Sequence, residues 1–205
     1  MEEKDDKIRH LVMEKYSGIA KGGGAGCGTS CCGGPSPLVN IADLGKTIGY
    51  TEEDLSLAPG EANLGLGCGN PLSRADLKPG ETVLDLGSGA GFDAFLAAGR
   101  IGPSGRVIGV DMTQEMVQKA RANAEKLRLT NVDFRLGQIE KLPVPDCSVD
   151  VVISNCVINL SIDKSAVFGE IYRTLKPGGR IVISDILSYG AIPEEIRNNP
   201  AAYTG

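Results

Sequence analysis

The stretch that most constrains the fold is residues 82–91, TVLDLGSGAG. Its first five residues form a short and nearly continuous apolar run, which is typical of a parallel strand buried on both faces. Gly87, Gly89 and Gly91 follow at alternate positions, and a second apolar run after them predicts a helix. Glycines between a strand and a helix let the backbone turn tightly and approach a ligand at the helix N-terminus. The stretch therefore predicts an α/β fold with a ligand site at this turn, and a plain structural turn is the alternative.

Downstream of this stretch, strand-like and helix-like segments alternate, as in a Rossmann-like, doubly wound and mostly parallel sheet. The predicted strands are residues 82–86, 106–111, 132–136, 149–154 and 180–186. The predicted helices between them are residues 92–100, 114–128 and 163–175. The glycine- and proline-containing segments LKPG (77–80), GPSG (102–105) and LKPGG (175–179) are interpreted as turns.

An N-terminal extension precedes the alternating region. Residues 3–19 predict a helix whose buried face carries Ile8, Leu11, Val12 and Ile19. Residues 41–58 predict one or two short helices, with Thr51 and Asp54 as a capping pair. We therefore divide the chain into residues 1–72, which carry cysteine-bearing loops that cover the site, and residues 73–205, which form the sheet domain.

Composition narrows the classes of partner. The formal charge is −5 and no basic block occurs, so nucleic-acid binding has no electrostatic support. The charged start MEEKDDK is not a signal peptide, and no 18-residue apolar run is present to span a membrane. We expect a cytoplasmic protein. The single histidine, His10, is expected to face solvent, which disfavours histidine-based catalysis.

Six cysteines are the most informative residues outside the glycine turn. In a cytoplasmic protein we expect them to be reduced thiols available for metal or metalloid binding or catalysis. Cys68 lies between glycines in ANLGLGCGNPL, and Cys156 directly follows a predicted strand. The others are Cys147, interpreted as an ordinary surface or packing cysteine, and three in the glycine-rich residues 21–37: Cys27, Cys31 and Cys32. Their spacing does not match a structural zinc site.

The spacing of the glycine turn also bears on the cofactor. It is GxGxG, whereas the dinucleotide fingerprint is GxGxxG, with Phe92 at the place of the last glycine. This difference favours S-adenosylmethionine, which has no pyrophosphate. Asp111 ends the second predicted strand, 20 residues beyond Gly91, where a carboxylate usually binds a ribose diol. Helix capping is the alternative role for Asp111, although Thr113 is available for it.

Four separated motifs occur in the order found in class I S-adenosylmethionine-dependent methyltransferases. They are Asp85 with GxGxG, Asp111 after the second strand, the loop GQIEKLP, and LKPGG. The resemblance covers about residues 72–186. The segments SCC, GLGCGNPL and SNCVINL extend it across nearly the whole chain and resemble the arsenite methyltransferases in particular.

This resemblance implies a set of cofactor contacts. The methionine end of S-adenosylmethionine would lie near Asp85, Gly87, Gly89 and Gly91, with Ser154 and Asn155 approaching it. The ribose and adenine would contact Asp111, Met112, Gln138, Ile139 and Glu140.

It also implies that Cys68 and Cys156 bind trivalent arsenic and that Cys32 (or Cys31) delivers or exchanges substrate. Arsenite or a thiol conjugate would be the substrate and a thiol reductant the second partner. The arsenic lone pair would attack the sulfonium methyl group, with no general base.

Two alternatives stay open at this point. One is methylation of a small organic acceptor, such as a quinone or sterol, with incidental cysteines. The other is a catalytically inactive arsenic- or metal-binding fragment. The family carries a further cysteine, two antiparallel edge strands and a C-terminal domain after the fifth strand, so we interpret these 205 residues as the N-terminal part of a longer chain, whose fifth strand would be an open edge.

Overall fold

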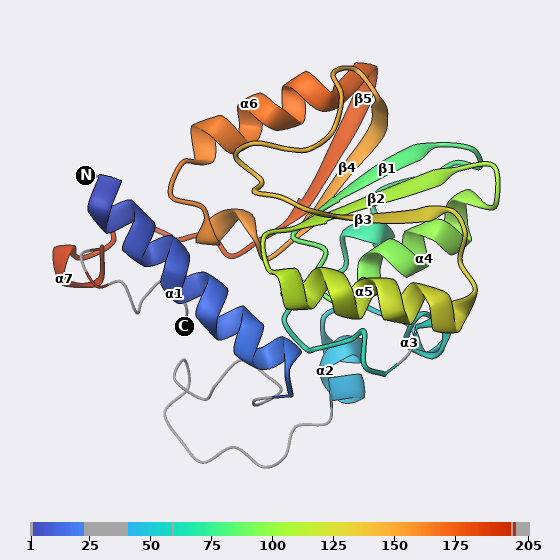
Figure 1. Ribbon diagram of the computed structural model, residues 1–205, viewed down its shortest axis with the longest axis horizontal. Coiled ribbons are helices and arrows are strands. Elements are labelled where there is room, and N and C mark those ends of the chain that lie inside the picture. The colour runs from blue at the N-terminus through green and yellow to red at the C-terminus, as the bar shows by residue number, and fades with distance from the viewer. Residues whose placement is uncertain (1, 23–40, 59, 198, 200–205) are drawn as a thin grey trace.

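Five parallel strands form the centre of the protein in the computed structural model, which describes residues 2–22, 41–58, 60–197 and 199 (Figure 1). The strands are β1 (Thr82–Leu86), β2 (Arg106–Asp111), β3 (Val132–Leu136), β4 (Val149–Asn155) and β5 (Leu175–Ser184). Their order in the sheet is β3-β2-β1-β4-β5, and every neighbouring pair is parallel. The predicted doubly wound α/β fold is confirmed.

The helices lie on both faces of this sheet. Figure 1 shows α4 (Phe92–Ile101) and α5 (Gln114–Leu127) on one face and α6 (Lys164–Thr174) on the other. The described residues also include α1 (Glu2–Ala20), α2 (Ile41–Thr47), α3 (Glu52–Leu57), α7 (Glu194–Arg197) and the 3₁₀ turns η2 (Pro71–Ser73) and η3 (Ile158–Leu160). The short helix α7 is not anticipated by the sequence pattern, which indicates only a polar, proline-interrupted segment there.

The two cores follow from the alternation of side chains along buried strands. Val83, on β1, packs in the cluster that includes α4 and α5, together with the partners Val107 and Val151 on its neighbours. The next residue, Leu84, belongs to the opposite cluster, which α6 closes with Val167. Because both faces are covered, the strands read as continuous apolar runs.

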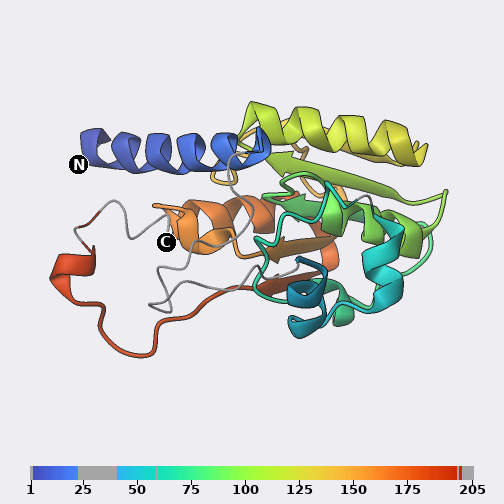
Figure 2. The same cartoon turned by 90° about the horizontal axis from the view of Figure 1, so that it is seen from below.

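The N-terminal extension packs against the sheet domain. Figure 2 shows the end of α1 beside the start of α5, where Lys21 forms a 2.9 Å ion pair with Glu115. Ile8, Val12 and Ile19 are buried as predicted, but Leu11 is 40% exposed, so the prediction for Leu11 is wrong. His10 is exposed, as expected.

The short helices α2 and α3 flank a residue that enters the main core. Thr51 and Asp54 form the predicted capping box of α3. Tyr50, directly before it, is buried in the cluster that also contains α4. None of the helices in the described ranges is both long and apolar enough to cross a membrane. The division of the chain at residue 72 stays a prediction. Tyr50 and Leu72 of the extension pack in the same hydrophobic cluster as Val83 of the sheet.

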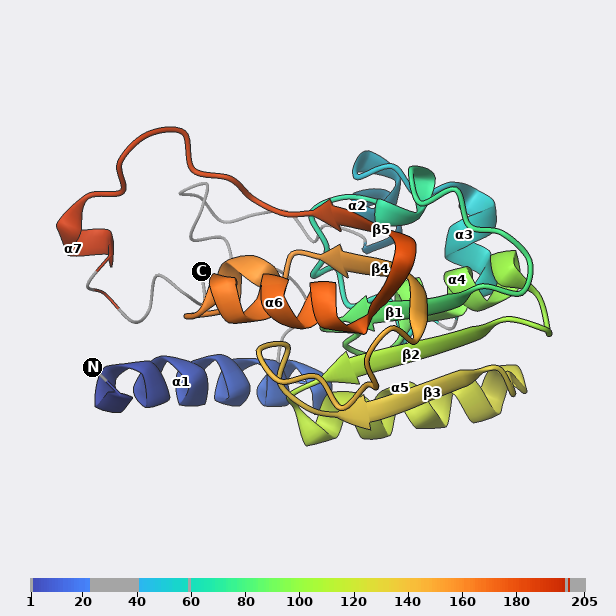
Figure 3. The same cartoon turned by 90° about the horizontal axis from the view of Figure 1, so that it is seen from above.

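β5 begins earlier than the sequence pattern predicts. The strand starts at Leu175, which pairs with Val149, and the next pair is Val151 with Arg180, so residues 176–179 form an irregularity within the strand. The interpretation of LKPGG as a turn outside the strand is therefore wrong, and the strand predicted at residues 180–186 has the bounds Leu175–Ser184 instead. Figure 3 shows β5 at the edge of the sheet, and Ile181 on it is 44% exposed. The predicted open edge is present in the described part of the chain.

Arg180, at which regular pairing of β5 with β4 resumes, binds the segment that precedes β1. Its guanidinium binds Glu81 through both terminal nitrogens, at 2.7 and 2.8 Å, and also donates to the carbonyl oxygens of Ala75 and Asp76. The Arg180 hydrogen bond holds the pKa of Glu81 below its ordinary value of 4.5. Because the folded-state pKa is the lower one, this pair stabilises the fold above about pH 4.5 and loses its contribution as pH falls through the folded-state pKa.

We expect Arg180→Met to lower the free energy of unfolding by about 1–3 kcal/mol at pH 7, because hydrogen bonds to a charged group are lost. The difference from the unsubstituted protein should narrow in acid, as Glu81 protonates in both proteins. Denaturant unfolding at pH 7 and pH 3 measures both quantities. Lys46→Met is the matched control, since its ion pair with Glu52 is exposed and its loss should leave the midpoint unchanged. Equal effects of the two substitutions at pH 7 would contradict the assignment.

Candidate functional site

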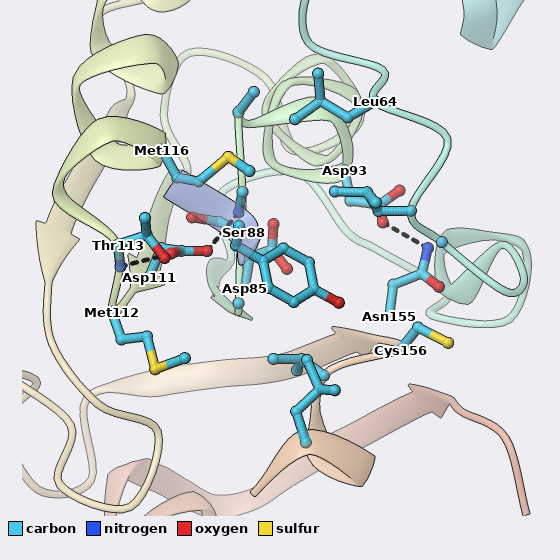
Figure 4. Close-up of a pocket in the computed structure, with 18 of the residues that line it drawn as sticks. Leu64, Asp85, Ser88, Asp93, Asp111, Met112, Thr113, Met116, Asn155 and Cys156 are labelled. Atoms are coloured by element: carbon cyan, nitrogen blue, oxygen red, sulfur yellow. Dashed lines mark hydrogen bonds between the residues drawn. The ribbon is translucent and has the colours of Figure 1, made fainter. Parts of the chain in front are cut away.

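A cavity of about 150 Å³ lies at the carboxyl ends of β1, β2 and β4 (Figure 4). This is the edge at which doubly wound sheets bind ligands, beside the point where the strand order reverses. Its wall includes nine of the residues predicted from the sequence: Asp85, Gly87, Gly89, Asp111, Met112, Ile139, Glu140, Asn155 and Cys156. Three others do not line it, namely Gly91, Gln138 and Ser154. Cys68 lies next to the wall rather than in it, and Cys32 falls outside the described residues.

The glycine turn forms the floor of the cavity. Gly89 has a φ of +52°, in the left-handed region that glycine adopts without a steric penalty. A Cβ built there meets no atom within 4 Å, so the space above Gly89 belongs to the cavity. Gly91 differs, because a Cβ there would lie 2.5 Å from the Phe95 ring. Gly91 is thus required for packing under α4, whereas Gly89 leaves room for a ligand.

Asp111 closes the glycine turn onto β2. Its carboxylate accepts a 2.9 Å hydrogen bond from the Gly89 N–H and a 2.8 Å bond from the Thr113 N–H. Burial raises the pKa of Asp111, and these two backbone hydrogen bonds partly oppose the rise. Thr113 stands at the N-cap of α5, but its side chain makes no capping hydrogen bond. The assumption that Thr113 caps the helix through its side chain is therefore wrong.

Asp85 and Ser88 line the cavity with buried oxygen atoms that have no hydrogen-bond partner in the described structure, and Asp85 is the ionisable one. It is 3% exposed, and its Oδ2 atom has no hydrogen-bond partner in the described structure. Burial raises its pKa, and the nearby Asp93 and Asp111 carboxylates raise it further. A buried polar atom without a partner is costly. The site therefore favours a ligand that brings a hydrogen-bond donor or a positive charge to Asp85.

A polar cluster that the sequence analysis missed forms one side of the cavity. Asp93, in the first turn of α4, accepts a 2.6 Å hydrogen bond from the hydroxyl of Tyr50 and a 2.9 Å bond from the amide of Asn155. Figure 4 shows the Asp93 carboxylate facing the Asn155 amide. Burial raises the pKa of Asp93, while both hydrogen bonds lower it. Burial, followed by the Asp93 charge, raises the pKa of Tyr50.

The opposite side of the cavity is more apolar. Met112 and Ile139 line it, and Glu140 joins them with its carboxylate accepting a 2.5 Å hydrogen bond from the Ser161 hydroxyl. Gln138 is exposed, and Ser154 is fully buried with no hydrogen-bond partner for its hydroxyl in the described residues. An apolar slot with one acceptor suits a flat heteroaromatic ring.

Helix α1 also contributes to the wall, through Arg9, Val12 and Tyr16. The sequence pattern placed Val12 in the core and favoured packing over ligand contact for Tyr16. The helical period identifies the buried face, but it does not say that part of this face borders a cavity.

Cys68 and Cys156 are joined by a disulfide bond in this structure. The loop at residues 65–69 and the end of β4 bring their Cα atoms to 5.7 Å, a separation that a disulfide spans readily. The expectation that all six cysteines are reduced thiols is therefore wrong for these two, and Cys68 is half-buried rather than fully exposed. Cys147 is free and exposed, which confirms its interpretation. Cys27, Cys31 and Cys32 lie outside the described residues.

Among the described residues, no group of three or more histidine, cysteine or acidic side chains is arranged to hold a metal ion. The pair Cys68 and Cys156 offers two sulfur ligands when reduced. The third sulfur predicted from the sequence, Cys32, is in a segment that the structure does not describe.

Comparison with known proteins agrees with the geometry. The sequence profile of a family described as "Methyltransferase domain" matches residues 77–205. The chain is 48% identical over 205 residues to an arsenite methyltransferase of Halobacterium salinarum, covering 98% of this chain and 52% of that protein. It is 43% identical to the human arsenite methyltransferase over 122 residues, which are 55% of this chain and 32% of the human protein.

Solved structures give the same fold. An arsenic(III) S-adenosylmethionine methyltransferase from Chlamydomonas reinhardtii superposes with a TM-score of 0.61 at 37% identity, covering 81% of this chain and 55% of that one. A SAM-dependent methyltransferase from Aquifex aeolicus superposes with a TM-score of 0.55 at 28% identity, covering 77% and 80%. This chain spans about half the length of the Halobacterium relative. The matched part is about a third of the length of the arsenite methyltransferases of Aquipseudomonas alcaligenes and mouse. The family profile nevertheless covers well over half of the chain, which therefore belongs to the methyltransferase domain family.

Proposed function

We propose that this chain carries the cofactor site and the substrate cysteines of an S-adenosylmethionine-dependent arsenite methyltransferase. The observation that carries the proposal is that Cys68 and Cys156 meet at the rim of the cavity that the glycine turn forms. The likeness to arsenite methyltransferases over 98% of the chain supports it. Methylation of a small organic acceptor would give these two cysteines no reason to converge.

The cavity fits S-adenosylmethionine in the chemistry of its wall. The unpartnered Asp85 oxygen suits the ammonium group of the methionine end, and the open space above Gly89 gives the ligand access to the backbone. Asp111 would accept from the ribose hydroxyls, and Met112, Ile139 and Glu140 would contact the adenine. The cofactor, when bound, supplies a methyl group that its sulfonium makes electrophilic.

The cysteines explain how the protein would hold arsenic as substrate. Trivalent arsenic is soft, and thiolates select soft centres. Bound by two or three thiolates, it keeps a lone pair, so the acceptor is already a nucleophile and no general base is required. Cys68, Cys156 and, in this proposal, Cys32 would position that atom at the cavity rim. Positioning of this kind lowers the barrier by about 7–11 kcal/mol in well-oriented reactions.

The disulfide makes a thiol reductant part of the proposal. Each sulfur must be a thiolate to bind arsenic, so the Cys68–Cys156 bond has to be reduced first. Two reduced thiol molecules supply the two electrons and leave as their own disulfide. We propose that these steps take place in the cytoplasm, where such reductants are abundant.

Incubation of the chain with arsenite, S-adenosylmethionine and a thiol reductant, followed by mass spectrometry, tests the whole proposal. We expect methylated arsenic as the product. Binding of both ligands without any product would support the two sites and would show that these 205 residues do not complete the reaction. Absence of arsenite binding to the reduced chain would overturn the substrate assignment.

Substitution of either rim cysteine tests the substrate site directly. We expect Cys68→Ser and Cys156→Ser each to abolish tight arsenite binding, because each substitution removes one of the two sulfur ligands that meet at the rim. Affinity for S-adenosylhomocysteine should stay within a few-fold, as measured by calorimetry. Cys147→Ser is the matched control, since that thiol is exposed and free. Normal arsenite binding by both rim variants would show that the site is misassigned.

Asp111→Ala tests the cofactor site. We expect S-adenosylhomocysteine to bind about 10- to 100-fold more weakly, the effect of losing a charge-assisted hydrogen bond. Arsenite binding to the reduced protein should persist. Asp133→Ala removes another strand carboxylate, one that pairs with Arg106 and Arg135 away from the cavity, and should leave cofactor affinity unchanged. An unaltered affinity in Asp111→Ala would contradict the ribose role.

A comparison of Gly89→Ala with Gly102→Ala distinguishes the loss of space for the ligand from the effect of backbone strain. Gly89 and Gly102 both have positive φ, +52° and +71°, and neither has an atom within 4 Å of a built Cβ. Alanine should therefore destabilise the fold at both positions, and more at Gly102, because its ψ of −178° places it in a region that essentially only glycine adopts. Only Gly89→Ala should weaken binding of S-adenosylhomocysteine, by at least about tenfold, because its methyl group occupies the cavity. Equal binding by the two variants would remove Gly89 from the site.

A further inference from the structure

Asn155 forms hydrogen bonds with the backbone of the loop that carries Cys68. Its Oδ1 atom accepts a 3.1 Å hydrogen bond from the Cys68 N–H, and its amide nitrogen donates to the Gly69 carbonyl oxygen at 2.9 Å. One side chain at the end of β4 thus binds the backbone at both ends of the Cys68–Gly69 dipeptide, 87 and 86 residues away in the chain. Asn155 is also the residue directly before Cys156.

Two buried groups hold this asparagine in turn. Its amide nitrogen lies 2.9 Å from Asp93 Oδ2 and 3.0 Å from Tyr50 Oη, while the Tyr50 hydroxyl donates to Asp93 Oδ1 at 2.6 Å. An ionised carboxylate only accepts hydrogen bonds, so Asp93 fixes which end of the amide is the NH₂ group. The Asn155 carbonyl oxygen is thereby turned toward the Cys68 N–H.

The glycines around Cys68 support the same contact by an independent route. A Cβ at Gly67 would lie 2.7 Å from the amide nitrogen of Asn155, and a Cβ at Gly69 would collide with the hydroxyl of Ser184. Only a backbone without side chains at these two positions can approach the ends of β4 and β5 so closely. The loop is therefore shaped to the groups that hold it.

We propose that Asn155, oriented by Asp93 and Tyr50, is a positioning residue that places the Cys68 sulfur beside Cys156. It acts on a pair of thiols, and its relevance to arsenic rests on the proposed function above. The effect is a high effective concentration of one thiol at the other, which a chelating arsenical requires. Asp93 and Tyr50 also line the cavity, so the same three side chains border the cofactor site and hold the substrate loop.

Thiol–disulfide exchange measures this positioning without any arsenic. The protein dithiol passes two electrons to oxidised glutathione, giving the protein disulfide and two reduced glutathione molecules, and the equilibrium constant is the effective concentration of the pair. The background carries Cys27→Ser, Cys31→Ser, Cys32→Ser and Cys147→Ser, so that only Cys68 and Cys156 respond. We expect Asn155→Ala to lower the constant about tenfold or more, for the loss of two hydrogen bonds.

Tyr50→Phe is the milder variant, since it keeps the ring packed edge-on against Phe92 at 5.0 Å and removes only the hydroxyl. We expect a loss of about three- to tenfold. In the Asn155→Ala background the same substitution should change the constant no further, because Tyr50 acts through Asn155. If Asn155→Ala does not fold, Tyr50→Phe alone decides the matter: a constant within twofold of the parent overturns the proposal.

Asn131→Ala is the matched control. Its amide also joins two backbone carbonyls, those of Ala98 and Gly102, but at the opposite end of the sheet. Denaturant unfolding gives the stability lost by each variant. We expect Asn131→Ala to lose stability with no change in the glutathione equilibrium. An equal shift of that equilibrium in Asn131→Ala would show that general loosening, rather than positioning, is responsible.

Phenylarsine oxide, which binds two thiols, separates this proposal from the function on which it rests. The reduced parent should bind it, and Asn155→Ala and Tyr50→Phe should bind more weakly by factors close to those in the glutathione assay. If the glutathione constants shift but the parent does not bind the arsenical, the positioning role stands and the arsenic function is overturned. If the parent binds it and the variants match the parent in both assays, the positioning role is overturned and the function stands.

Discussion

The constraint on which the rest of the structure depends is the reversal of strand order at β1. β1 pairs with β2 on one side and β4 on the other, all parallel, so the chain leaves β1 in one direction and later returns to its other edge. α4 and α5, which follow β1 and β2, cover one face, and α6, which follows β4, covers the other, so the carboxyl ends of β1 and β4 stay open between them. The glycine turn after β1 then meets the segment after β4. A Cβ at Gly87 would collide with Val157, which shows how close the two segments are.

This closeness puts three carboxylates around one small, largely apolar space. In the described part of the chain, Asp85, Asp93 and Asp111 form no ion pair, and burial raises the pKa of each. The protein satisfies Asp111 with backbone N–H groups and Asp93 with a hydroxyl and an amide. It leaves one oxygen of Asp85 without a partner. The Asp85 oxygen that remains calls for a hydrogen-bond donor or a positive charge, and an ammonium group of a ligand supplies both.

The sequence was most informative where local chemistry decides the structure. Continuous apolar runs gave the sheet, and the strand bounds of β1, β2 and β3 agree with the prediction. The start of β5 was missed because Pro177 and the glycines after it are turn signals, whereas the sheet accommodates them as an irregularity within the strand. A local signal cannot show that pairing resumes on both sides of an interruption.

The site was predicted less completely, for a related reason. Most residues of the cavity wall follow a strand and could be identified from motifs. Asp93 could not, because an acidic residue in the first turn of a helix is ordinarily an exposed partner of the helix dipole. Its partner Tyr50 lies 43 residues earlier and Asn155 62 residues later, so only the fold shows that the three groups meet. The redox state of Cys68 and Cys156 is likewise absent from the sequence, although their convergence was anticipated.

The end of β4 shows how one backbone feature lets neighbouring residues serve the same loop. In a regular strand, Asn155 and Cys156 would point to opposite faces. Cys156 instead has a φ of +59°, a left-handed conformation that costs a non-glycine residue on the order of 1–2 kcal/mol. Its N–H is held by the Ser184 carbonyl oxygen at 2.8 Å, which keeps the chain in this conformation. Both side chains consequently reach Cys68, one through its backbone N–H and the other through its sulfur. Strain retained at such a position is characteristic of functional sites, and here it lets two neighbouring residues at the end of a strand hold the loop that carries Cys68.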